Sequence, residues 1–258
     1  MDIHLNGRFF VVCGAGSGFG KAVAERLVRE GAGVLAIARR KESLLALQKL
    51  NPAAIEILPG DLTKPGFIDE LKKALKGRIP DGVLVNAGGP PAKSFRETLL
   101  KDWDEAYQSL LRWKVDLIQS LLPGFIERKY GRIVLVESMS VKQPVEHLVL
   151  SNSLRMAVVG MAKTLANEVG SHGITVNTLA PGYHDTPAME RLFAKRSELL
   201  KIPIAEARRL FEKELMTGRM GDPNEFAMLA AWLLSPSSGY INGQTFSVDG
   251  GLVKFVFG

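Results

Sequence analysis

The turn from Cys13 to Gly20 is the first segment of the chain whose residue types could do chemistry. It reads CGAGSGFG and lies between the apolar run RFFVVC and the amphipathic segment KAVAERLVREG. Glycines let a backbone turn sharply and come close to a pyrophosphate, while the positive N-terminus of the next helix attracts the phosphates. The alternative is an ordinary strand-to-helix turn. Because this turn follows a first strand and opens a helix, we predict a dinucleotide site formed by Gly14, Ser17, Gly18, Phe19 and Gly20.

The corner after the next apolar run bears on which dinucleotide would bind. This segment reads VLAIARRKES, so Ala38 and Arg39 occupy the place where NAD-binding folds carry an acid that holds the ribose hydroxyls. Arginine matches a 2′-phosphate in geometry and charge, and no carboxylate is present there to repel it. We therefore predict NADP(H) as the preferred cofactor, with NAD(H) as the alternative. Without a ligand, Arg39 and Arg40 would simply be a solvent-exposed pair.

These motifs lie within a regular alternation of apolar and amphipathic segments. The strand candidates are RFFVVC, GVLAIA, AAIEIL, GVLVN, GRIVLVE, GITVNTLA and QTFSVDG. Seven short strands separated by helix-length segments predict a parallel sheet, and right-handed crossovers place helices on both of its faces. The predicted fold class is α/β, a doubly wound Rossmann-type fold. At about 186–221 the chain carries more helix than a tight crossover needs, so we expect a helical insertion over the ligand-binding ends of the strands.

Length and composition agree with one domain covering residues 1–258. The chain is 46% apolar and 23% charged, which is enough to bury a substantial core. No run stays apolar for the ~18 residues of a membrane span and the N-terminus lacks a signal-peptide pattern, so we expect a cytoplasmic protein that does not bind membranes. The net charge is +6, but basic residues alternate with acids, as in Lys195 to Leu215. That pattern is typical of solvated helices and does not predict nucleic-acid binding.

Cysteine and histidine usage argues against a metal site. Cys13 is the single cysteine of the chain, so neither an intrachain disulfide nor a cysteine cluster can form, and the four histidines show no metal-binding spacing. Cys13 could be a redox nucleophile at a helix N-terminus, but a buried and inert thiol is the favoured interpretation.

Taken in order, the motifs resemble those of the short-chain dehydrogenase/reductase family, and within it the 3-oxoacyl-(acyl-carrier-protein) reductases. Gly14, Gly18 and Gly20 match the family's Thr-Gly-x-x-x-Gly-x-Gly motif, with Cys13 in place of the threonine. Four further segments match in the same order: Asp61-Leu62, Asn86-Ala87-Gly88, Pro181-Gly182 with Thr186, and NGQTFSVDGG from Asn242 to Gly251. The resemblance implies that the cofactor is also bound by Asp61, Leu62, Asn86, Ala87, Gly88, Pro181, Gly182 and Thr186.

The same resemblance places four catalytic positions, and three of them depart from the family pattern. Ser138 falls on the family's catalytic serine, which follows the strand GRIVLVE. The family's tyrosine and lysine correspond to Ser151 and Arg155 in the segment SNSLR, and its asparagine corresponds to Leu110. A serine hydroxyl is a far weaker acid than a phenol, and arginine does not release its proton. The usual proton donor and proton relay are therefore missing.

Several groups could replace the lost function if the protein is catalytic. Ser151 and Arg155 are one helical turn apart and should face the cofactor together, where Arg155 could bind the nicotinamide ribose. The hydroxyls of Ser138 and Ser151 could hold a carbonyl oxygen as an oxyanion site. We rank His147 first as a proton source, because histidine titrates near neutrality. The other candidates are Glu137, Tyr183, His184 and a bound water. Alternatively, SNSLR is only a polar helix start, with Ser151 or Ser153 as the N-cap.

These observations favour an NADP-preferring oxidoreductase that interconverts a carbonyl and an alcohol on a small or acyl substrate, or that reduces an activated double bond. SNSLR and Leu110 leave two other classes open: a catalytically silent protein that senses NADP(H) or acts as a partner subunit, and a non-redox lyase or isomerase. Members of the resembled family pair their long helices, so we expect a homodimer or homotetramer. Small residues on the second long helix, such as Gly160, would permit close approach.

Overall fold

Seven parallel strands form one sheet in the order β3-β2-β1-β4-β5-β6-β7. The structure is a computed structural model and describes residues 2–256. The strands are β1 (Phe9–Cys13), β2 (Gly33–Ala38), β3 (Ile55–Pro59), β4 (Gly82–Val85), β5 (Gly131–Val136), β6 (Ile174–Pro181) and β7 (Thr245–Val248). The seven predicted strands are confirmed. Because β1 pairs with both β2 and β4, the winding direction reverses between β1 and β4, where such sheets bind ligands.

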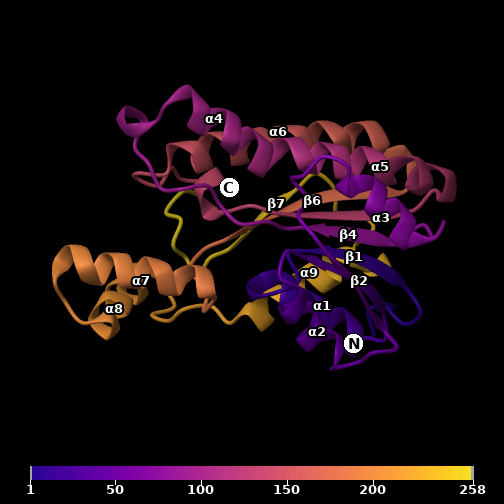
Figure 1. The fold of residues 1–258 in the computed structure, drawn as a ribbon, viewed down its shortest axis with the longest axis horizontal. Helices are drawn as coiled ribbons and strands as arrows, with labels where there is room; N and C mark the ends of the chain where they lie inside the picture. Colours follow the sequence, from indigo (N-terminus) through magenta and orange to yellow (C-terminus); the bar gives the residue numbers. More distant parts are fainter. Residues whose placement is uncertain (1, 257–258) are drawn as a thin grey trace.

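The helices form two layers around the sheet (Figure 1). They are α1 (Gly18–Arg29), α2 (Lys41–Gln48), α3 (Phe67–Leu75), α4 (Leu100–Tyr107), α5 (Trp113–Arg128), α6 (Val149–Val169), α7 (Pro187–Leu200), α8 (Ile204–Glu214) and α9 (Pro223–Leu234). Helices α1, α2 and α9 share one apolar core with the sheet, and α3, α5 and α6 share the core on the opposite face. Both faces of the sheet are therefore shielded from solvent, and every residue of β5 and β6 is buried.

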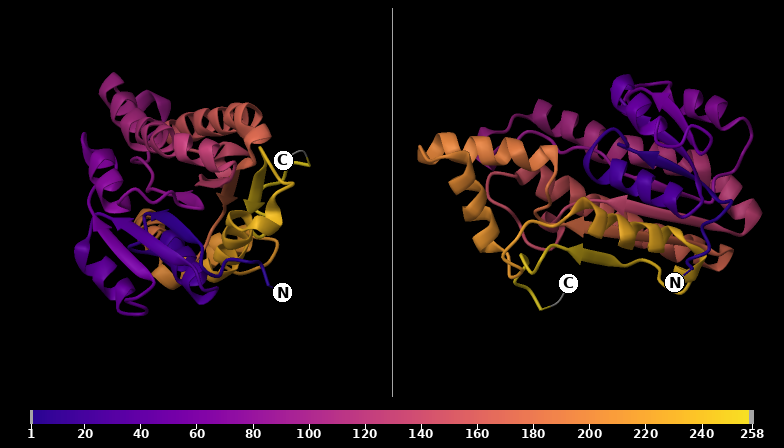
Figure 2. Two further views of the ribbon diagram at one scale, coloured as in Figure 1. Left: turned by 90° about the vertical axis from the view of Figure 1, so that its right-hand side faces the viewer. Right: turned by 90° about the horizontal axis from the view of Figure 1, so that it is seen from below.

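Helices α7 and α8 extend beyond the carboxyl ends of the strands (Figures 1 and 2). They lie within the segment 186–221 and are separated by a short break after Leu200. A third apolar cluster fastens them to the rest of the molecule: Phe193 of α7 and Phe211 of α8 pack with Met139, which follows β5. The two helices thus cover the edge of the sheet where the predicted site residues lie.

The entry to α5 is irregular. A single π-helical turn, η2 (Gln108–Arg112), joins α4 to α5. Leu110, Trp113 and Lys114 are all buried beside it, with no more than 3% of any of these residues exposed. A π turn rotates the side chains that follow it relative to a regular α-helix, and such turns are frequent at functional sites. Here the turn is followed two residues later by Lys114, whose side chain lies inside the protein.

No helix within residues 2–256 combines the length and the apolar character that a bilayer span requires.

The N-terminus of α9 should contribute measurably to stability. The Asp222 carboxylate accepts a hydrogen bond from the Asn224 backbone N–H at 2.8 Å, and Glu225 closes the capping box. We expect Asp222→Ala to lower the free energy of unfolding by about 1 kcal/mol in urea denaturation. Asp104→Ala, at an exposed position inside α4, is the control and should change it by less than about 0.5 kcal/mol. An unchanged midpoint for Asp222→Ala would contradict this assignment of the cap.

Candidate functional site

The glycine turn packs closely against the end of β4. Gly14 and Gly18 have positive φ angles of 68° and 52°, a region that favours glycine. A Cβ atom on Gly14 would lie 2.6 Å from Nδ2 of Asn86, and a Cβ on Gly18 would lie 3.5 Å from Cγ2 of Thr186. Three segments predicted to bind the cofactor, at Gly14–Gly20, Asn86 and Thr186, therefore meet at one place.

The N-terminus of α1 is open to an anion. Ser17 is its N-cap, yet its side chain makes no capping hydrogen bond, and the first turn carries no acidic residue. The backbone N–H groups and the dipole of this twelve-residue helix can therefore act on a phosphate. The Phe19 ring is turned away from this opening, because it packs against the rings of Phe226 and His184 at centroid distances of 4.2 and 4.9 Å. Phe19 can thus offer a ligand its backbone N–H.

The residues predicted for the adenosine end also meet. Arg39 is exposed just after β2, and Asp61 follows β3, the neighbouring strand. Burial acts to raise the pKa of Asp61, but hydrogen bonds from the Thr63 backbone and hydroxyl, together with the charge of Arg39, hold that pKa below its ordinary value. Asp61 is therefore an ionised acceptor, while Leu62 packs against the apolar core beside it.

The two remaining segments predicted to bind the cofactor, at Gly88 and at Gly182, differ in how much space surrounds the backbone. A Cβ on Gly88, which follows Asn86 and Ala87, would meet nothing within 4 Å. Gly182, directly after Pro181 at the end of β6, is packed against the Asp249 backbone instead. The loop after β4 is thus a surface over which a ligand can lie, whereas Gly182 serves the close packing of two chain segments.

Ser151 and Arg155 lie side by side in the first turns of α6. The N-cap of this helix is Leu148, so neither Ser151 nor Ser153 caps it. Arg155 Nε donates a hydrogen bond to Ser151 Oγ at 3.1 Å, and both residues are buried, with 6% and 7% of their surfaces exposed. Ser151 and Arg155 are therefore a structured polar pair inside the protein, and neither serine of SNSLR caps the helix.

A buried ionic triad joins Arg155 to two residues from other elements. Arg155 Nη1 contacts Glu137 Oε2 at 3.0 Å and the Glu137 backbone oxygen at 3.1 Å, while Lys114 Nζ binds Glu137 Oε1. The exposed fractions of the Lys114, Glu137 and Arg155 side chains are 1%, 0% and 7%. Burial lowers the pKa of Lys114, and the Glu137 carboxylate opposes that shift. We call this group the buried ionic triad.

Sequence reasoning missed Lys114, although a signal was present. Lys114 is four residues after Leu110, so a regular helix would place both on one face, and Leu110 belongs to an apolar face. Glu137 ends the apolar strand segment GRIVLVE. A lysine and a glutamate that are both directed into the core require partners of opposite charge. The sequence thus indicates that both charges need a partner, but it does not show that Lys114 and Glu137 contact each other.

The proton-source candidates have different surroundings. His147 is exposed, has a φ of 57°, and among residues 2–256 makes no hydrogen bond to Ser138 or Ser151. Tyr183 donates its hydroxyl to Glu214 Oε2 at 3.1 Å; burial, reinforced by Glu214, raises its pKa to about 12. Tyr183 is therefore directed towards α8.

The other two candidates are buried. His184 packs on Phe19, and burial lowers the pKa of its imidazole. Glu137 is held in the buried ionic triad. Ser138 Oγ accepts a hydrogen bond from the Ser140 backbone N–H at 3.1 Å and is half-buried, so its own proton can still be donated to a ligand.

Two other features of the predicted site have clear environments. Cys13 is fully buried, and this burial raises the pKa of its thiol to about 12, which agrees with an inert thiol. Among residues 2–256, no three histidine, cysteine or acidic side chains are grouped as they would be around a metal ion.

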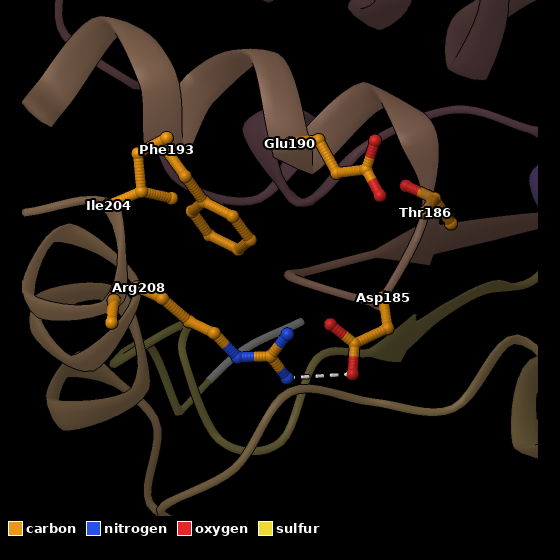
Figure 3. A pocket seen from close by; sticks show the side chains of 7 residues that line it. Asp185, Thr186, Glu190, Phe193, Ile204 and Arg208 are labelled. Carbon is orange, nitrogen blue, oxygen red and sulfur yellow. Dashed lines mark hydrogen bonds and ion pairs between the residues drawn. The ribbon is translucent and has the colours of Figure 1, made fainter.

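A pocket of about 430 Å³ opens between α7 and α8 (Figure 3). Arg208 Nη2 and Asp185 Oδ2 are 2.8 Å apart across its lower side, and Glu190 and Thr186 lie on the side of α7 (Figure 3). Thr186 also contacts the glycine turn, so the pocket adjoins the predicted cofactor site. Its lining includes none of Ser138, Ser151 and Arg155.

Comparison with known proteins decides the family. The family model described as enoyl-(acyl carrier protein) reductase matches residues 14–253. The 3-oxoacyl-(acyl-carrier-protein) reductase of Thermotoga maritima is 32% identical, with 97% of this chain and all of the relative covered. Dehydrogenase/reductase SDR family member 6 of Xenopus laevis is also 32% identical, covering 96% and 98%. The chain belongs to the short-chain dehydrogenase/reductase family.

Solved structures of this oxidoreductase family superimpose over nearly the whole chain. The L-sorbose reductase of Gluconobacter frateurii, complexed with NADPH and L-sorbose, matches with a TM-score of 0.92 and 26% identity, covering 99% of this chain and all of the other. An actinorhodin polyketide ketoreductase with NADPH matches with a TM-score of 0.90 and 29% identity, covering 96% and 98%. The predicted Rossmann-type fold is confirmed.

The positions predicted to bind the cofactor and those predicted to be catalytic have different surroundings in the structure. The glycine turn, Asn86 and Thr186 converge as the family motif implies. At the positions predicted to be catalytic, Leu110 is fully buried in the π turn, Arg155 is hydrogen-bonded to Ser151, and Arg155 is paired with Glu137. These residues can offer hydrogen bonds and a fixed positive charge to a ligand.

The close packing of Gly14 on Asn86 should make the glycine turn intolerant of a side chain. We expect Gly14→Ala to weaken NADPH binding at least about tenfold, because the new methyl group meets Asn86 and the backbone is in a region that favours glycine. Fluorescence titration with NADPH measures this. Asp104→Ala, at an exposed position inside α4, is the control. Equal affinities for the two variants would contradict the assignment.

Proposed function

We propose that this protein is an NADP(H)-dependent reductase that interconverts a carbonyl and an alcohol without a tyrosine proton donor. The observation that carries the proposal is the hydrogen bond from Arg155 Nε to Ser151 Oγ. Because Ser151 accepts from Arg155, its own O–H is directed elsewhere, and among residues 2–256 it donates no hydrogen bond. A substrate oxygen is a suitable acceptor.

The described residues fit an NADP(H) cofactor. The open N-terminus of α1 would hold the pyrophosphate, Asp61 the adenine and Arg39 the 2′-phosphate. The loop at Gly88 and the Arg155 guanidinium would accommodate the nicotinamide ribose. When bound, NADPH supplies the hydride. Two structural relatives, the L-sorbose reductase and the polyketide ketoreductase, were solved with NADPH, which supports this assignment.

In the proposed mechanism the protein stabilises negative charge on the substrate oxygen. The hydroxyls of Ser138 and Ser151 would donate hydrogen bonds to that oxygen, and the guanidinium of Arg155 would add a positive field in a site with little water. Arg155 keeps its proton, so the proton for the product must come from another group. His147 is the first side chain that we propose for this step, and a bound water is the alternative.

The substrate is proposed from the relatives and from the pocket. Several relatives are named as 3-oxoacyl-(acyl-carrier-protein) reductases, and one structural relative is a polyketide ketoreductase. The pocket between α7 and α8 combines Asp185 and Arg208 with apolar side chains, so it offers both polar and apolar contacts. These features support a small or acyl carbonyl compound. As in the family, we propose self-association through α5 and α6.

A second candidate function is favoured by the buried ionic triad. Arg155 stands between Glu137 and Ser151 and cannot pass a proton from one to the other. A protein that binds NADP(H) and never turns it over, as a sensor or partner subunit, would have this arrangement. Stoichiometric NADPH binding with no turnover on ketones, 3-oxoacyl thioesters or quinones would favour it. Substrate conversion without a change in cofactor absorbance would instead indicate a lyase or isomerase.

Arg39 should select NADPH over NADH. We expect Arg39→Ala to weaken NADPH binding about ten- to a hundredfold, because a charge-assisted hydrogen bond to phosphate is worth ~1.5–3 kcal/mol. NADH binding should stay within about threefold, since that cofactor lacks the 2′-phosphate. Titration of both cofactors against Arg39→Ala and the control Arg40→Ala measures the ratio. An unchanged preference in Arg39→Ala would remove Arg39 from the site.

The two serine hydroxyls should contribute to kcat. We expect Ser138→Ala and Ser151→Ala each to lower kcat about 10²- to 10³-fold in NADPH oxidation with a panel of ketones and 3-oxoacyl thioesters, as for the loss of one oxyanion donor. Ser153→Ala, at an exposed position on α6, should be unchanged. If Ser138→Ala and Ser151→Ala each kept the wild-type kcat, the proposed mechanism would be contradicted.

A further inference from the structure

The buried ionic triad accounts for most of the hydrogen-bonding groups of Arg155. A guanidinium has five N–H groups. The Nε group donates to Ser151 Oγ, and the two groups on Nη1 donate to the Glu137 carboxylate and the Glu137 backbone oxygen. The two groups on Nη2 have no hydrogen-bond partner among residues 2–256, and Nη2 is not one of the fully buried unpartnered atoms, so it can be reached from outside although only 6% of the residue is exposed. One edge of the guanidinium is thus left for a ligand.

The free edge points to the cofactor loop. A Cβ on Gly89 would lie 3.5 Å from Arg155 Nη2, and Gly89 directly follows the Asn86-Ala87-Gly88 segment. Arg155 is not placed there by its own helix alone, because its long side chain has many rotamers. Its direction is set by the two contacts with Glu137, which lies at the end of β5.

Glu137 in turn depends on Lys114. Lys114 binds Oε1 and Arg155 binds Oε2, so each carboxylate oxygen has one cation and the carboxylate group cannot rotate without losing a contact. A carboxylate with 0% exposure and no partner would strongly destabilise the fold. The two buried cations would be just as unfavourable without the carboxylate. The three residues therefore form one unit.

We propose that Lys114 and Glu137 are positioning residues that hold the Nη2 edge of Arg155 towards the bound cofactor. This proposal rests on the proposed function for the identity of the ligand. Lys114 is not a nucleophile here, because it is 1% exposed and bound to Glu137. Nor is the triad a proton relay, because the permanently protonated arginine separates Glu137 from Ser151.

The test is a set of variants that separates orientation from folding. Glu137→Gln alone leaves two buried cations without a carboxylate, which is strongly destabilising. The informative protein is therefore Lys114→Met/Glu137→Gln, which keeps the net charge of the triad. The control is Arg78→Met/Glu56→Gln, which removes an exposed ion pair elsewhere. Thermal melting establishes that each variant folds, and fluorescence titration gives the NADPH dissociation constant.

We expect the Lys114→Met/Glu137→Gln protein to fold and to bind NADPH about tenfold more weakly than wild type. Adding Arg155→Ala to that double variant should weaken binding by less than about threefold, whereas Arg155→Ala in the wild-type background should weaken it about tenfold. The control pair should leave affinity unchanged. A folded double variant with wild-type affinity would overturn the proposal, as would full additivity of the Arg155→Ala effect.

A second readout does not depend on the ligand. The Arg155 Nε–H, bound to buried Ser151, should exchange slowly with solvent in side-chain nitrogen NMR, and its signal is assigned by its absence in Arg155→Lys. Rapid exchange in Lys114→Met/Glu137→Gln supports positioning, and slow exchange there overturns it. If wild type does not bind NADPH, the proposed function fails, while this experiment still decides whether the pair orients Arg155.

Discussion

Both faces of the parallel sheet are covered by helices, and this burial decides where charged groups can lie. Every residue of β5 is buried, and Glu137 follows directly at its end with no part of its side chain exposed. A carboxylate in such surroundings must be bound by cations. Lys114 of α5 and Arg155 of α6 meet this requirement from opposite sides of the carboxylate. The orientation of Lys114 and Arg155 therefore depends on the charge of one buried acid.

The cofactor segments are governed by a different constraint, which is the room available to the backbone. Gly14 adopts a conformation that favours glycine and packs against Asn86, so the first and fourth strands are held together at their carboxyl ends. The helix that follows the turn has no acid and no side-chain cap at its start. These features need only backbone geometry, so the predicted phosphate site does not depend on the side chains at the positions predicted to be catalytic.

Ser151 and Arg155, at positions predicted to be catalytic, would support a reaction in a different way from a tyrosine–lysine pair. A lysine and a phenol can share and transfer protons, whereas an arginine bound to a carboxylate supplies a constant field. Lys114, Glu137 and Leu110 fit that difference: the two charged residues complete the ionic group, and the leucine fills the π turn nearby. Ser151 and Arg155, which are predicted to depart from the family pattern, are thus connected in space to Glu137 and Lys114.

Much of the fold was determined by the sequence itself, because its signals are local. Seven apolar runs of strand length, separated by amphipathic segments, predicted the parallel sheet, and the spacing of Gly14, Gly18 and Gly20 predicted the turn. Ser151 and Arg155 were predicted to face the same way because they are one helical turn apart, and the hydrogen bond between them agrees. Such properties depend on neighbouring residues, so they can be inferred before the chain is folded.

Other features were decided only by tertiary structure. Lys114 and Arg155 are 23 and 18 residues from Glu137 in sequence, and their meeting depends on the π turn and on how α5 and α6 pack over the sheet. In the same way, the His184 ring packs on Phe19 because a loop after β6 crosses the start of α1. No periodicity encodes such distances. Burial imposes the need for a partner, but the packing of elements far apart in the chain selects which residue provides it.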